Sequence, residues 1–323
     1  MTPPTTTTDR RTPHPDTDPR RLAWALLSLA ADGPSNPLWH LIATYGVTAA
    51  AAAVAEKLAT GIDRRVLARA KPGQIARLVS AHYAADSRLL TPDDPEWPTD
   101  LLPPRPAAAD TDFVAPLALW VRGQPSLREI AARSVAVVGV LQRHDHDTVI
   151  DETVEHLVRQ SRVVATTGAF GTAARAIEAT LHHRAATLTV AAVGTDLPHP
   201  HQHRALFERQ HDAGGLLVSP YPPGTAIAGH RGIYRDQLLA ALCGATVVIT
   251  AGRRGSAYRT AHWAHQLQRR VHAFPGPDTD PAYTGANRLL LERTATPLSR
   301  PADIPVPEIE PEPSTAVYTA TRK

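Results

Sequence analysis

The spacing of apolar residues separates the chain into a helical part and a part in which strands and helices alternate. From residue 21 to residue 89, apolar residues recur at the three- and four-residue spacing of one helix face. The residues that carry this pattern are Leu22, Leu26 and Leu29, followed by Val66, Ile75, Leu78 and Val79. The pattern predicts a small helical domain over residues 21–89.

Six short apolar runs of β-type residues follow between residues 131 and 300. They are Val135–Val138, Val163–Thr166, Leu188–Val193, Leu216–Val218, Thr246–Thr250 and Val271–Phe274. Most runs are apolar throughout, and each is separated from the next by enough residues for a crossover helix, which favours a parallel sheet covered on both faces. We therefore expect an α/β protein whose Rossmann-like domain, residues 131–300, binds its ligand at the carboxyl ends of the strands.

Segments rich in proline flank these two parts. Residues 90–130 contain many prolines, which helix interiors and central strands exclude, so this segment is predicted to be an extended lead-in to the sheet. The two ends, residues 1–20 and 301–323, are rich in proline and lack apolar periodicity. Both ends are predicted to be disordered tails.

The composition is that of a globular protein with room for two domains, because 43% of the 323 residues are hydrophobic. No run approaches the ~20 apolar residues of a membrane helix, and neither end resembles a signal peptide. We expect a soluble, cytoplasmic protein without a membrane partner. The single cysteine, Cys243, falls on the expected buried face of a helix, which argues against a disulfide and against a thiolate nucleophile.

Positive charge gathers between Arg231 and Arg270. This stretch holds seven arginines and one acidic residue, Asp236, so its local charge is +6 against +3 for the whole chain. No Asp or Glu occurs in residues 237–277, so this half of a site offers anion-binding groups but no carboxylate. The chain has 31 arginines and 3 lysines, and a general bias toward arginine explains part of the richness but not the missing acidic residues. The segment predicts a receptor for phosphates.

Glycines follow the first two predicted strands of the sheet. Gly139 ends the first strand where the chain must turn sharply toward a helix. No glycine follows it up to Asp145, so the GxGxxG signature of dinucleotide sites is incomplete, and we expect no nicotinamide or flavin cofactor. After the second strand, Gly168 and Gly171 would let backbone amides approach an anion at the start of the next helix.

The loop after the fifth strand combines positive charge with the start of a helix. Arg253 and Arg254 precede Gly255 and Ser256, and Ser256 is predicted to cap a helix with an alanine-rich inner face. Because a helix N-terminus carries partial positive charge, the dipole and the two arginines favour the same phosphate ligand. An exposed loop with idle arginines is the alternative.

Other polar clusters indicate a ligand less clearly. Tyr221 lies in a rigid Pro-Gly turn, where it either stacks on a base or covers the end of the sheet. The histidines in residues 144–147 and 199–203 lack a second partner set at metal-site spacing, which favours solvated histidines over a metal site. No Ser-His-Asp order, nucleophile elbow or P-loop is recognisable, so we expect no catalytic residue.

The order of these pieces resembles the DNA-processing protein A family, also called DprA or Smf. The motifs that carry the resemblance are Leu117–Gly123, Ser134–Gly139, Gly194–Pro198, Pro220–Thr225, Arg235–Ala240, Gly255–Ser256 with Thr260–Ala261, Val271–Gly276 and Gly285–Arg288. With the helical amino-terminal domain they form a collinear series that covers most of the chain. The resemblance implies a homodimeric protein that binds and protects single-stranded DNA and hands it to the RecA recombinase.

The chain departs from the family pattern at three places. Residues 140–141 read Val-Leu where the family has Ser-Arg, and Arg143 is the nearest substitute for the lost charge. Ala173 and Ile177 stand where the family has Asp and His. Residues 235–237 read Arg-Asp-Gln instead of Arg-Asn-Arg, which introduces a carboxylate beside the phosphate path. The winged-helix module of many members is not expected at the carboxyl end.

We predict a non-catalytic protein that binds the backbone of single-stranded DNA and assists RecA loading in DNA uptake or recombination. The predicted ligand-binding residues are Gly139, Arg143, Gly168, Gly171, Arg231, Arg235, Arg253, Arg254, Gly255, Ser256 and Arg259. Because such a site reads phosphates, its affinity should tolerate any base sequence and fall with salt.

Two other functions stay open at this point. Nucleotide phosphoribohydrolases of the lonely-guy type resemble this sheet architecture, but the turn from Gly252 to Thr260 lacks their glutamate, so general acid-base catalysis has no evident agent. A paralogue that has lost DNA binding and acts as a protein scaffold would be indifferent to replacement of Arg253 and Arg254.

Overall fold

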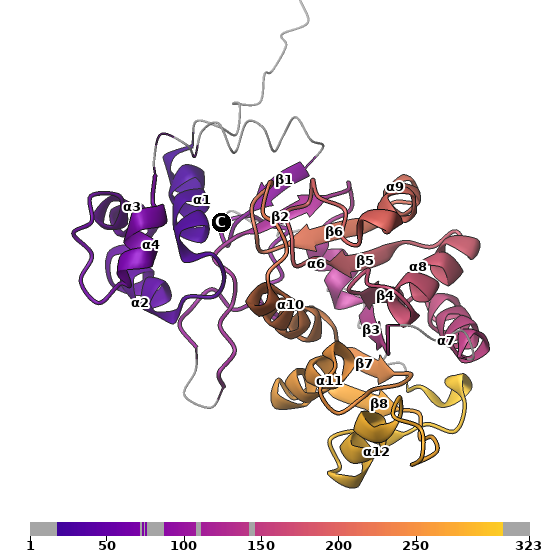
Figure 1. Ribbon diagram of the computed structural model, residues 1–323. Coiled ribbons are helices and arrows are strands. Elements are labelled where there is room, and N and C mark those ends of the chain that lie inside the picture. Colours follow the sequence, from indigo (N-terminus) through magenta and orange to yellow (C-terminus); the bar gives the residue numbers. More distant parts are fainter. Residues whose placement is uncertain are drawn as a thin grey trace, which may run out of the picture.

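A nine-stranded sheet organises the described part of the chain. The computed structural model describes residues 18–71, 73, 75, 87–107, 111–141 and 146–305. The strands are β1 (Ser87–Leu90), β2 (Leu119–Arg122), β3 (Ser134–Val138), β4 (Val163–Thr166), β5 (Thr187–Val190), β6 (Leu216–Ser219), β7 (Ala245–Val248), β8 (Arg270–Ala273) and β9 (Thr296–Pro297). Their order across the sheet is β1-β2-β6-β5-β4-β3-β7-β8-β9 (Figure 1).

Strands β3 to β8 correspond to the six predicted strands, and all of them pair in parallel. The chain enters at the central strand β3 and moves outward through β4, β5 and β6. It then returns to the other side of β3 and continues through β7, β8 and β9. The loops that follow β3 and β7 therefore diverge, which opens a crevice at the carboxyl ends of these two strands. The expected Rossmann-like α/β fold is confirmed.

Helices cover both faces of the sheet because its strands are apolar on both sides. The helices that follow the parallel strands are α7 (Asp147–Arg159), α8 (Thr172–His182), α9 (Arg204–Asp212), α10 (Gly229–Leu242), α11 (Ser256–Gln266) and α12 (Thr284–Leu291). Val135 and Val137 of β3 belong to the core shared with α7 and α8, whereas Ala136 and Val138 belong to the core shared with α10 and α11 (Figure 1). Cys243 follows α10 and is fully buried.

Two strands and a helix lie in the segment that the sequence analysis treats as an extended lead-in. β1 and β2 pair antiparallel and join the sheet beside β6, and α6 (Leu127–Ala132) follows. Arg88 of β1 ties this segment together, because its guanidinium contacts Glu96 and the carbonyl oxygens of Gly123 and Pro125. The prolines lie between these elements and leave the hydrogen bonds of both strands intact.

The amino-terminal helices form a layer beside the sheet, next to α10 (Figure 1). They are α1 (Pro19–Ala31), α2 (Asn36–Tyr45), α3 (Val47–Ala55) and α4 (Arg64–Arg69). Of the predicted apolar positions, Leu26 is buried, Leu22 and Leu29 are partly buried against the same core, and Leu78 and Val79 lie outside the described residues. A small helical domain thus precedes the sheet, as the periodicity predicts.

The predicted tails lie mostly outside the described residues. Within the described part, α1 begins at Pro19, and the carboxylate of Asp18 caps it by accepting a hydrogen bond from the backbone N–H of Arg20 at 3.0 Å. At the other end, a 3₁₀ turn spans Pro301–Asp303, and Ile304 is buried in the core beneath α7. These few residues therefore close the ends of the folded unit.

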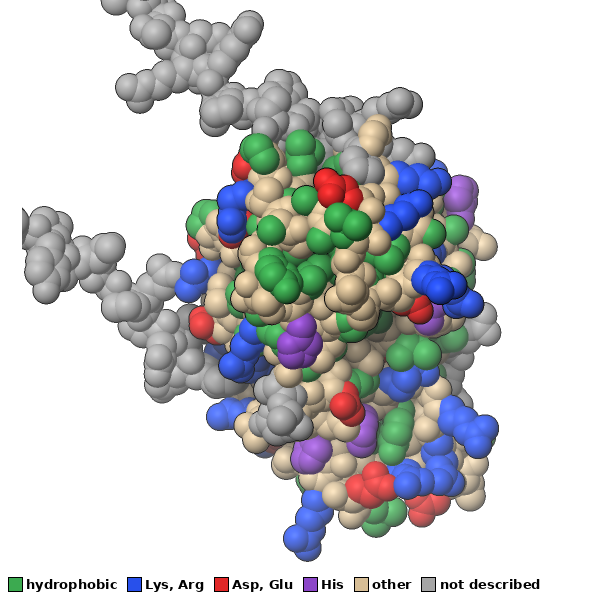
Figure 2. Space-filling view, turned by 90° about the vertical axis from the view of Figure 1, so that its left-hand side faces the viewer, with side chains coloured by type: hydrophobic (Ala, Val, Ile, Leu, Met, Phe, Trp, Pro, Cys, Tyr) green, Lys and Arg blue, Asp and Glu red, His purple; other side chains and the backbone are tan. Residues whose placement is uncertain are grey.

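The surface of the helical domain shows scattered hydrophobic side chains near its centre and most of its Lys and Arg side chains toward its margins (Figure 2). Among the described helices, none alone is long and apolar enough to cross a membrane. α2 and α3 reach the required length and composition together, but the chain bends by 120° between them.

Trp39 anchors the helical domain, and its replacement by alanine should destabilise the protein strongly. Its ring is 1% exposed, lies 5.6 Å from the ring of Trp24, and donates from Nε1 to the carbonyl of Ala115 at 2.8 Å. Trp39→Ala should lower the free energy of unfolding by about 3–5 kcal/mol, as measured by urea denaturation. Tyr45 on the same helix is 67% exposed, and Tyr45→Ala should change it by less than about 0.5 kcal/mol. Equal losses in the two variants would contradict this packing.

Candidate functional site

A cavity of about 910 Å³ opens at the carboxyl ends of the central strands, where the sequence predicts a ligand. Its walls come from the loops after β3, β4, β5 and β7 and from the middle of α10. The lining residues are Val138, Gly139, Val140, Leu141, Thr166, Thr167, Ala169, Phe170, Ala173, His199, Pro200, His201, Gln202, Arg235, Gly252, Arg254, Gly255, Ser256, Ala257 and Arg259. One side of the cavity is apolar and the other carries arginines.

The glycines after β3 and β4 let two loops pack closely against each other. A Cβ at Gly139 would overlap the side chain of Thr172, and one at Gly171, where φ is +69°, would overlap the backbone of Leu141. The N–H of Thr172, at the start of α8, donates to the carbonyl of Val140 at 3.2 Å. This amide is therefore occupied within the protein.

Gly168 has a similar packing role. Its φ is also +69°, and a Cβ there would overlap the ring of Phe207. Neither Gly168 nor Gly171 lines the cavity, whereas Gly139 does. The three glycines shape the wall through close backbone approach, which only a residue without a side chain permits.

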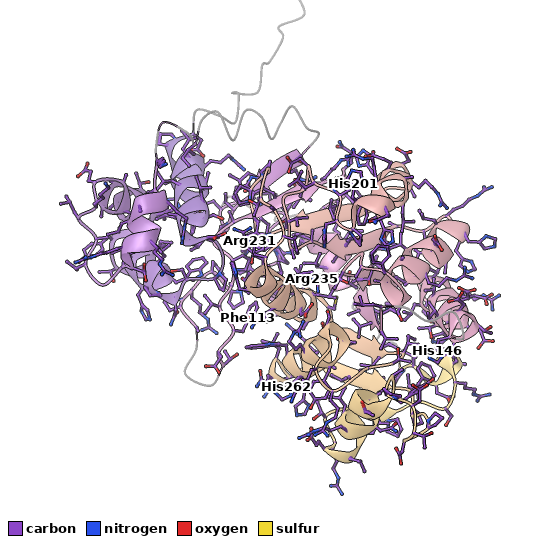
Figure 3. The ribbon with its side chains drawn as sticks, in the orientation of Figure 1. Phe113, His146, His201, Arg231, Arg235 and His262 are labelled. Atoms are coloured by element: carbon purple, nitrogen blue, oxygen red, sulfur yellow. The ribbon has the colours of Figure 1, made fainter. Side chains whose placement is uncertain are left out.

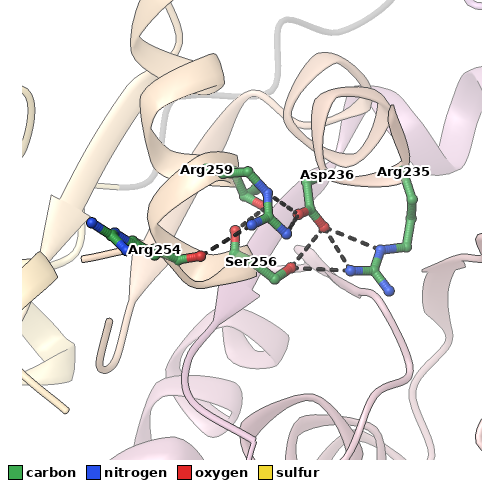
Figure 4. A network of polar contacts seen from close by, with 6 residues as sticks. Arg235, Asp236, Arg254, Ser256 and Arg259 are labelled. Carbon is green, nitrogen blue, oxygen red and sulfur yellow. Dashed lines mark hydrogen bonds and ion pairs between the residues drawn. The ribbon is translucent and has the colours of Figure 1, made fainter. Parts of the chain in front are cut away.

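A buried carboxylate joins α10 to α11 behind the cavity wall. Asp236 is 0% exposed, and its Oδ1 accepts hydrogen bonds from Nε and Nη2 of Arg235 at 3.1 and 2.7 Å (Figure 4). The same oxygen accepts from Oγ of Ser256 at 2.6 Å. Oδ2 accepts from Nε and Nη2 of Arg259 at 3.0 and 2.8 Å. Five donors on three residues thus converge on one carboxylate.

This arrangement turns two arginines toward the cavity in fixed positions. Arg235 and Arg259 line the cavity, while Asp236 does not. The side chain of Arg235 is 13% exposed, and its Nη1 makes no hydrogen bond to any of the described residues. Two guanidinium groups, those of Arg235 and Arg259, bind the one carboxylate, and Arg254 adds a third positive charge to the lining, so the wall keeps a net charge of +2.

The first turn of α11 forms the rest of the cationic wall. Gly255, Ser256 and Ala257 line the cavity, so the positive end of the helix dipole faces it. The carbonyl of Arg254 accepts from Nη1 of Arg259 at 3.1 Å, which ties the loop to the helix (Figure 4). The prediction that Ser256 caps α11 is wrong: Gly255 is the capping residue, and the hydroxyl of Ser256 is bonded to Asp236.

Three of the predicted arginines lie away from this wall or outside the described residues. Arg231 lies on the side of α10 toward the helical domain (Figure 3), where its Nη2 contacts Asp32 at 2.8 Å. Its guanidinium carbon also lies 5.3 Å from the ring centre of Tyr221. Arg253 is exposed and does not line the cavity, and Arg143 lies outside the described residues.

Tyr221 is buried, and His203 is held by contacts within the protein. Tyr221 is 1% exposed and covers the end of the sheet near the helical domain, so it offers no free face to a base. Nδ1 of His203 lies 2.9 Å from the carbonyl oxygen of Gly168. In the described part of the chain, no group of three His, Cys, Asp or Glu side chains is placed to hold a metal ion.

The apolar wall contains residues that the sequence analysis did not single out as ligands. Leu141 and Phe170 are 58% and 38% exposed and line the cavity from the loops after β3 and β4. Ala173, where the family has Asp, also lines this wall, whereas Ile177 is buried behind it. Apolar residues in loops carry no sequence signal that separates a ligand wall from a core contact.

His199 completes the site next to Arg235. Burial lowers the pKa of His199, and the positive charge of Arg235 lowers it further. The imidazole is therefore neutral at pH 7, because its pKa lies below the ordinary histidine value of about 6.5.

Removal of the buried carboxylate should be far more costly than removal of a surface one. Asp236→Ala leaves Arg235 and Arg259 without their shared partner, and the free energy of unfolding should fall by about 3–5 kcal/mol, measured by urea denaturation. Asp303 pairs with Arg300 on the surface at 2.9 Å, and Asp303→Ala should cost less than about 1 kcal/mol. A small loss for Asp236→Ala would show that the network does not hold the two helices.

Comparison with known proteins shows the family to which the chain is similar. The model of the DNA recombination-mediator protein A family matches residues 88–306. A relative from Mycobacterium tuberculosis H37Rv, named as a DNA processing protein DprA, is 36% identical over 280 residues, which are 84% of this chain and 71% of the relative. Protein Smf of Synechocystis is 30% identical over 212 residues, 64% of this chain and 51% of Smf.

Solved structures support the same fold. DNA processing protein A of Streptococcus pneumoniae superposes with a TM-score of 0.67 and 21% identity, covering 87% of this chain and 96% of that protein. The Helicobacter pylori protein, described by its single-stranded DNA binding mode, superposes with a TM-score of 0.55 and 18% identity over 67% of this chain and 92% of that protein. By sequence and by fold, this chain belongs to the DprA/Smf family of DNA-processing proteins.

Proposed function

We propose that the chain binds the backbone of single-stranded DNA in the cavity between the loops after β3 and β7, without catalysing a reaction. The observation that carries the proposal is the convergence of Arg235, Arg254 and the first turn of α11 on one cavity. A phosphate there would meet guanidinium donors and the positive end of a helix dipole at the same time.

The family supports the ligand class. The matching family model is that of a DNA recombination mediator, and the H. pylori relative is a protein whose single-stranded DNA binding is described. Partnership with the RecA recombinase in DNA uptake or recombination, and assembly as a homodimer, belong to the same proposal and rest on the resemblance. A protein scaffold without DNA binding is the third function considered. It would leave the positive charge of the cavity wall without a ligand.

The residues proposed to contact DNA are fewer than those predicted from sequence. Arg235, Arg254 and Arg259, with Gly255 and Ser256 at the helix start, face the cavity and are retained. Arg231 is engaged with Asp32 and is better explained as a link to the helical domain.

A carboxylate for catalysis is missing from the described cavity wall. The described lining residues include no Asp or Glu. Asp236 lies behind the cavity wall, but it is buried, and both of its carboxylate oxygens accept hydrogen bonds from Arg235, Ser256 or Arg259. Glycosidic hydrolysis needs a carboxylic acid or carboxylate that reaches the substrate, so the phosphoribohydrolase interpretation loses support.

Arg254 and its neighbour Arg253 provide a matched test of the site. Both are exposed arginines in one loop, but Arg254 lines the cavity and Arg253 does not. Arg254→Ala should weaken binding of fluorescent oligo(dT) and lower the slope of log K against log salt by about 0.7, the value for one phosphate contact on a single strand. Arg253→Ala should change the slope much less. Anisotropy titrations from low to moderate salt measure both, and identical behaviour of the two variants would contradict the proposed site.

DNA affinity should rise as the pH falls, because of His199. A phosphate beside Arg235 stabilises the protonated imidazole and raises the pKa of His199, so binding takes up a proton. Affinity should therefore increase as the pH falls toward and below the ordinary histidine pKa of about 6.5, because the pKa of His199 in the free protein lies below that value. His199→Gln should flatten this dependence in the same anisotropy assay. If the wild-type affinity falls as the pH is lowered, binding does not take up a proton at His199, and the prediction is wrong.

A further inference from the structure

The cavity has two chemically different walls, and each matches one part of a nucleotide. One wall is formed by the arginines of α10 and of the β7–α11 region together with the start of α11. The other is formed by Leu141 and Phe170 in the loops after β3 and β4. β4 and β7 are both neighbours of β3, so their loops emerge about 10 Å apart. A ligand that fills this space needs an anionic end and a flat apolar end.

Phe170 is held in place on the apolar wall. The residue lies in the loop between Gly168 and Gly171, both of which have φ of +69°. Its ring meets the ring of His203 edge to face, with centroids 4.7 Å apart. His203 is in turn fixed by the carbonyl of Gly168, 2.9 Å from its Nδ1, and by the ring of Phe207 at 6.2 Å.

This support leaves one side of an aromatic ring free. Phe170 remains 38% exposed, although a phenylalanine of a folded core is normally buried. Leu141, which also lines the cavity, is 58% exposed, and the two contribute an apolar surface to a cavity that also carries arginines. Exposed apolar surface inside a cavity commonly marks the place where a ligand is covered.

We propose that Phe170 is a stacking platform for one nucleobase, positioned by His203, so that the cavity holds one base together with its neighbouring phosphate. This inference rests on the proposed function, because it takes the ligand of the cationic wall to be a DNA strand. A base reaches Phe170 only when it is unpaired, and the platform therefore makes the site selective for single strands over duplex. Stacking accepts every base, which agrees with binding that tolerates any sequence.

The test compares strands with and without bases. Fluorescein-labelled oligo(dT) of 20 nucleotides and an abasic strand of the same length are titrated with the full chain in anisotropy experiments. Phe170→Ala should weaken oligo(dT) binding about tenfold and leave the abasic strand unchanged, because stacking on an aromatic ring contributes to each bound base. Phe170→Tyr keeps a ring and should restore most of the affinity. Tyr45→Ala, which removes a 67% exposed aromatic ring from the helical domain, is the matched control and should leave both affinities unchanged.

Each outcome decides the inference. An unchanged oligo(dT) affinity in Phe170→Ala, or an equal loss on the abasic strand, overturns it. If Phe170→Ala does not fold, as judged by circular dichroism, the wild-type affinities for oligo(dT) and the abasic strand are compared instead. Equal affinities overturn the proposed stacking, and tighter binding of oligo(dT) supports it. Loss of binding in Arg254→Ala with no effect of Phe170→Ala removes the platform and keeps the proposed function. Failure of the wild type to bind either strand contradicts both the stacking role of Phe170 and the proposed function.

Discussion

The carboxylate of Asp236 is the constraint on which the site depends. It is fully buried between α10 and α11 and receives five hydrogen bonds, so it fixes where two arginines and one helix start stand relative to one another. Unpaired arginines in so crowded a wall would repel each other and turn outward. With one shared carboxylate behind them, Arg235 and Arg259 both line the cavity and the wall stays positive. The carboxylate of Asp236 therefore orders the two arginines and reduces the net charge of the wall by one.

The sheet topology explains why the cavity lies where it does. The chain leaves β3 toward β4 and later returns to the other side of β3 at β7, which opens a crevice at the carboxyl ends of β3 and β7. Gly139 and Gly171 let the loops after β3 and β4 lie against each other and close the apolar wall. On the far side of α10, Arg231 ties the same helix to Asp32 of the helical domain. The helix that carries Arg235 is thus held from both sides.

The sequence alone predicts the sheet and part of the site. Continuous apolar runs identify the six parallel strands because both faces of the sheet are buried. Charge and the following helix pattern indicate the Arg253–Ser256 loop, of which Arg254, Gly255 and Ser256 line the cavity. Arg231 belongs to the arginine-rich stretch that predicts phosphate binding, yet its partner Asp32 is 199 residues away and leaves no local pattern. The sequence predicts a carboxylate beside the phosphate path at Asp236, since it does not show that this side chain lies behind the arginines. Phe170 and Leu141 were missed because apolar loop residues resemble core residues.

A crystal structure of the full chain with a short oligo(dT) strand would test the central claim most directly, since it locates each phosphate relative to Asp236 and its partners. The account predicts a phosphate within hydrogen-bond distance of Arg235, Arg254 and the backbone amides at the start of α11, with Asp236 still bonded to both Arg235 and Arg259. A strand bound on another surface, with this cavity empty, would contradict it. So would a phosphate that displaces Asp236 from the arginines.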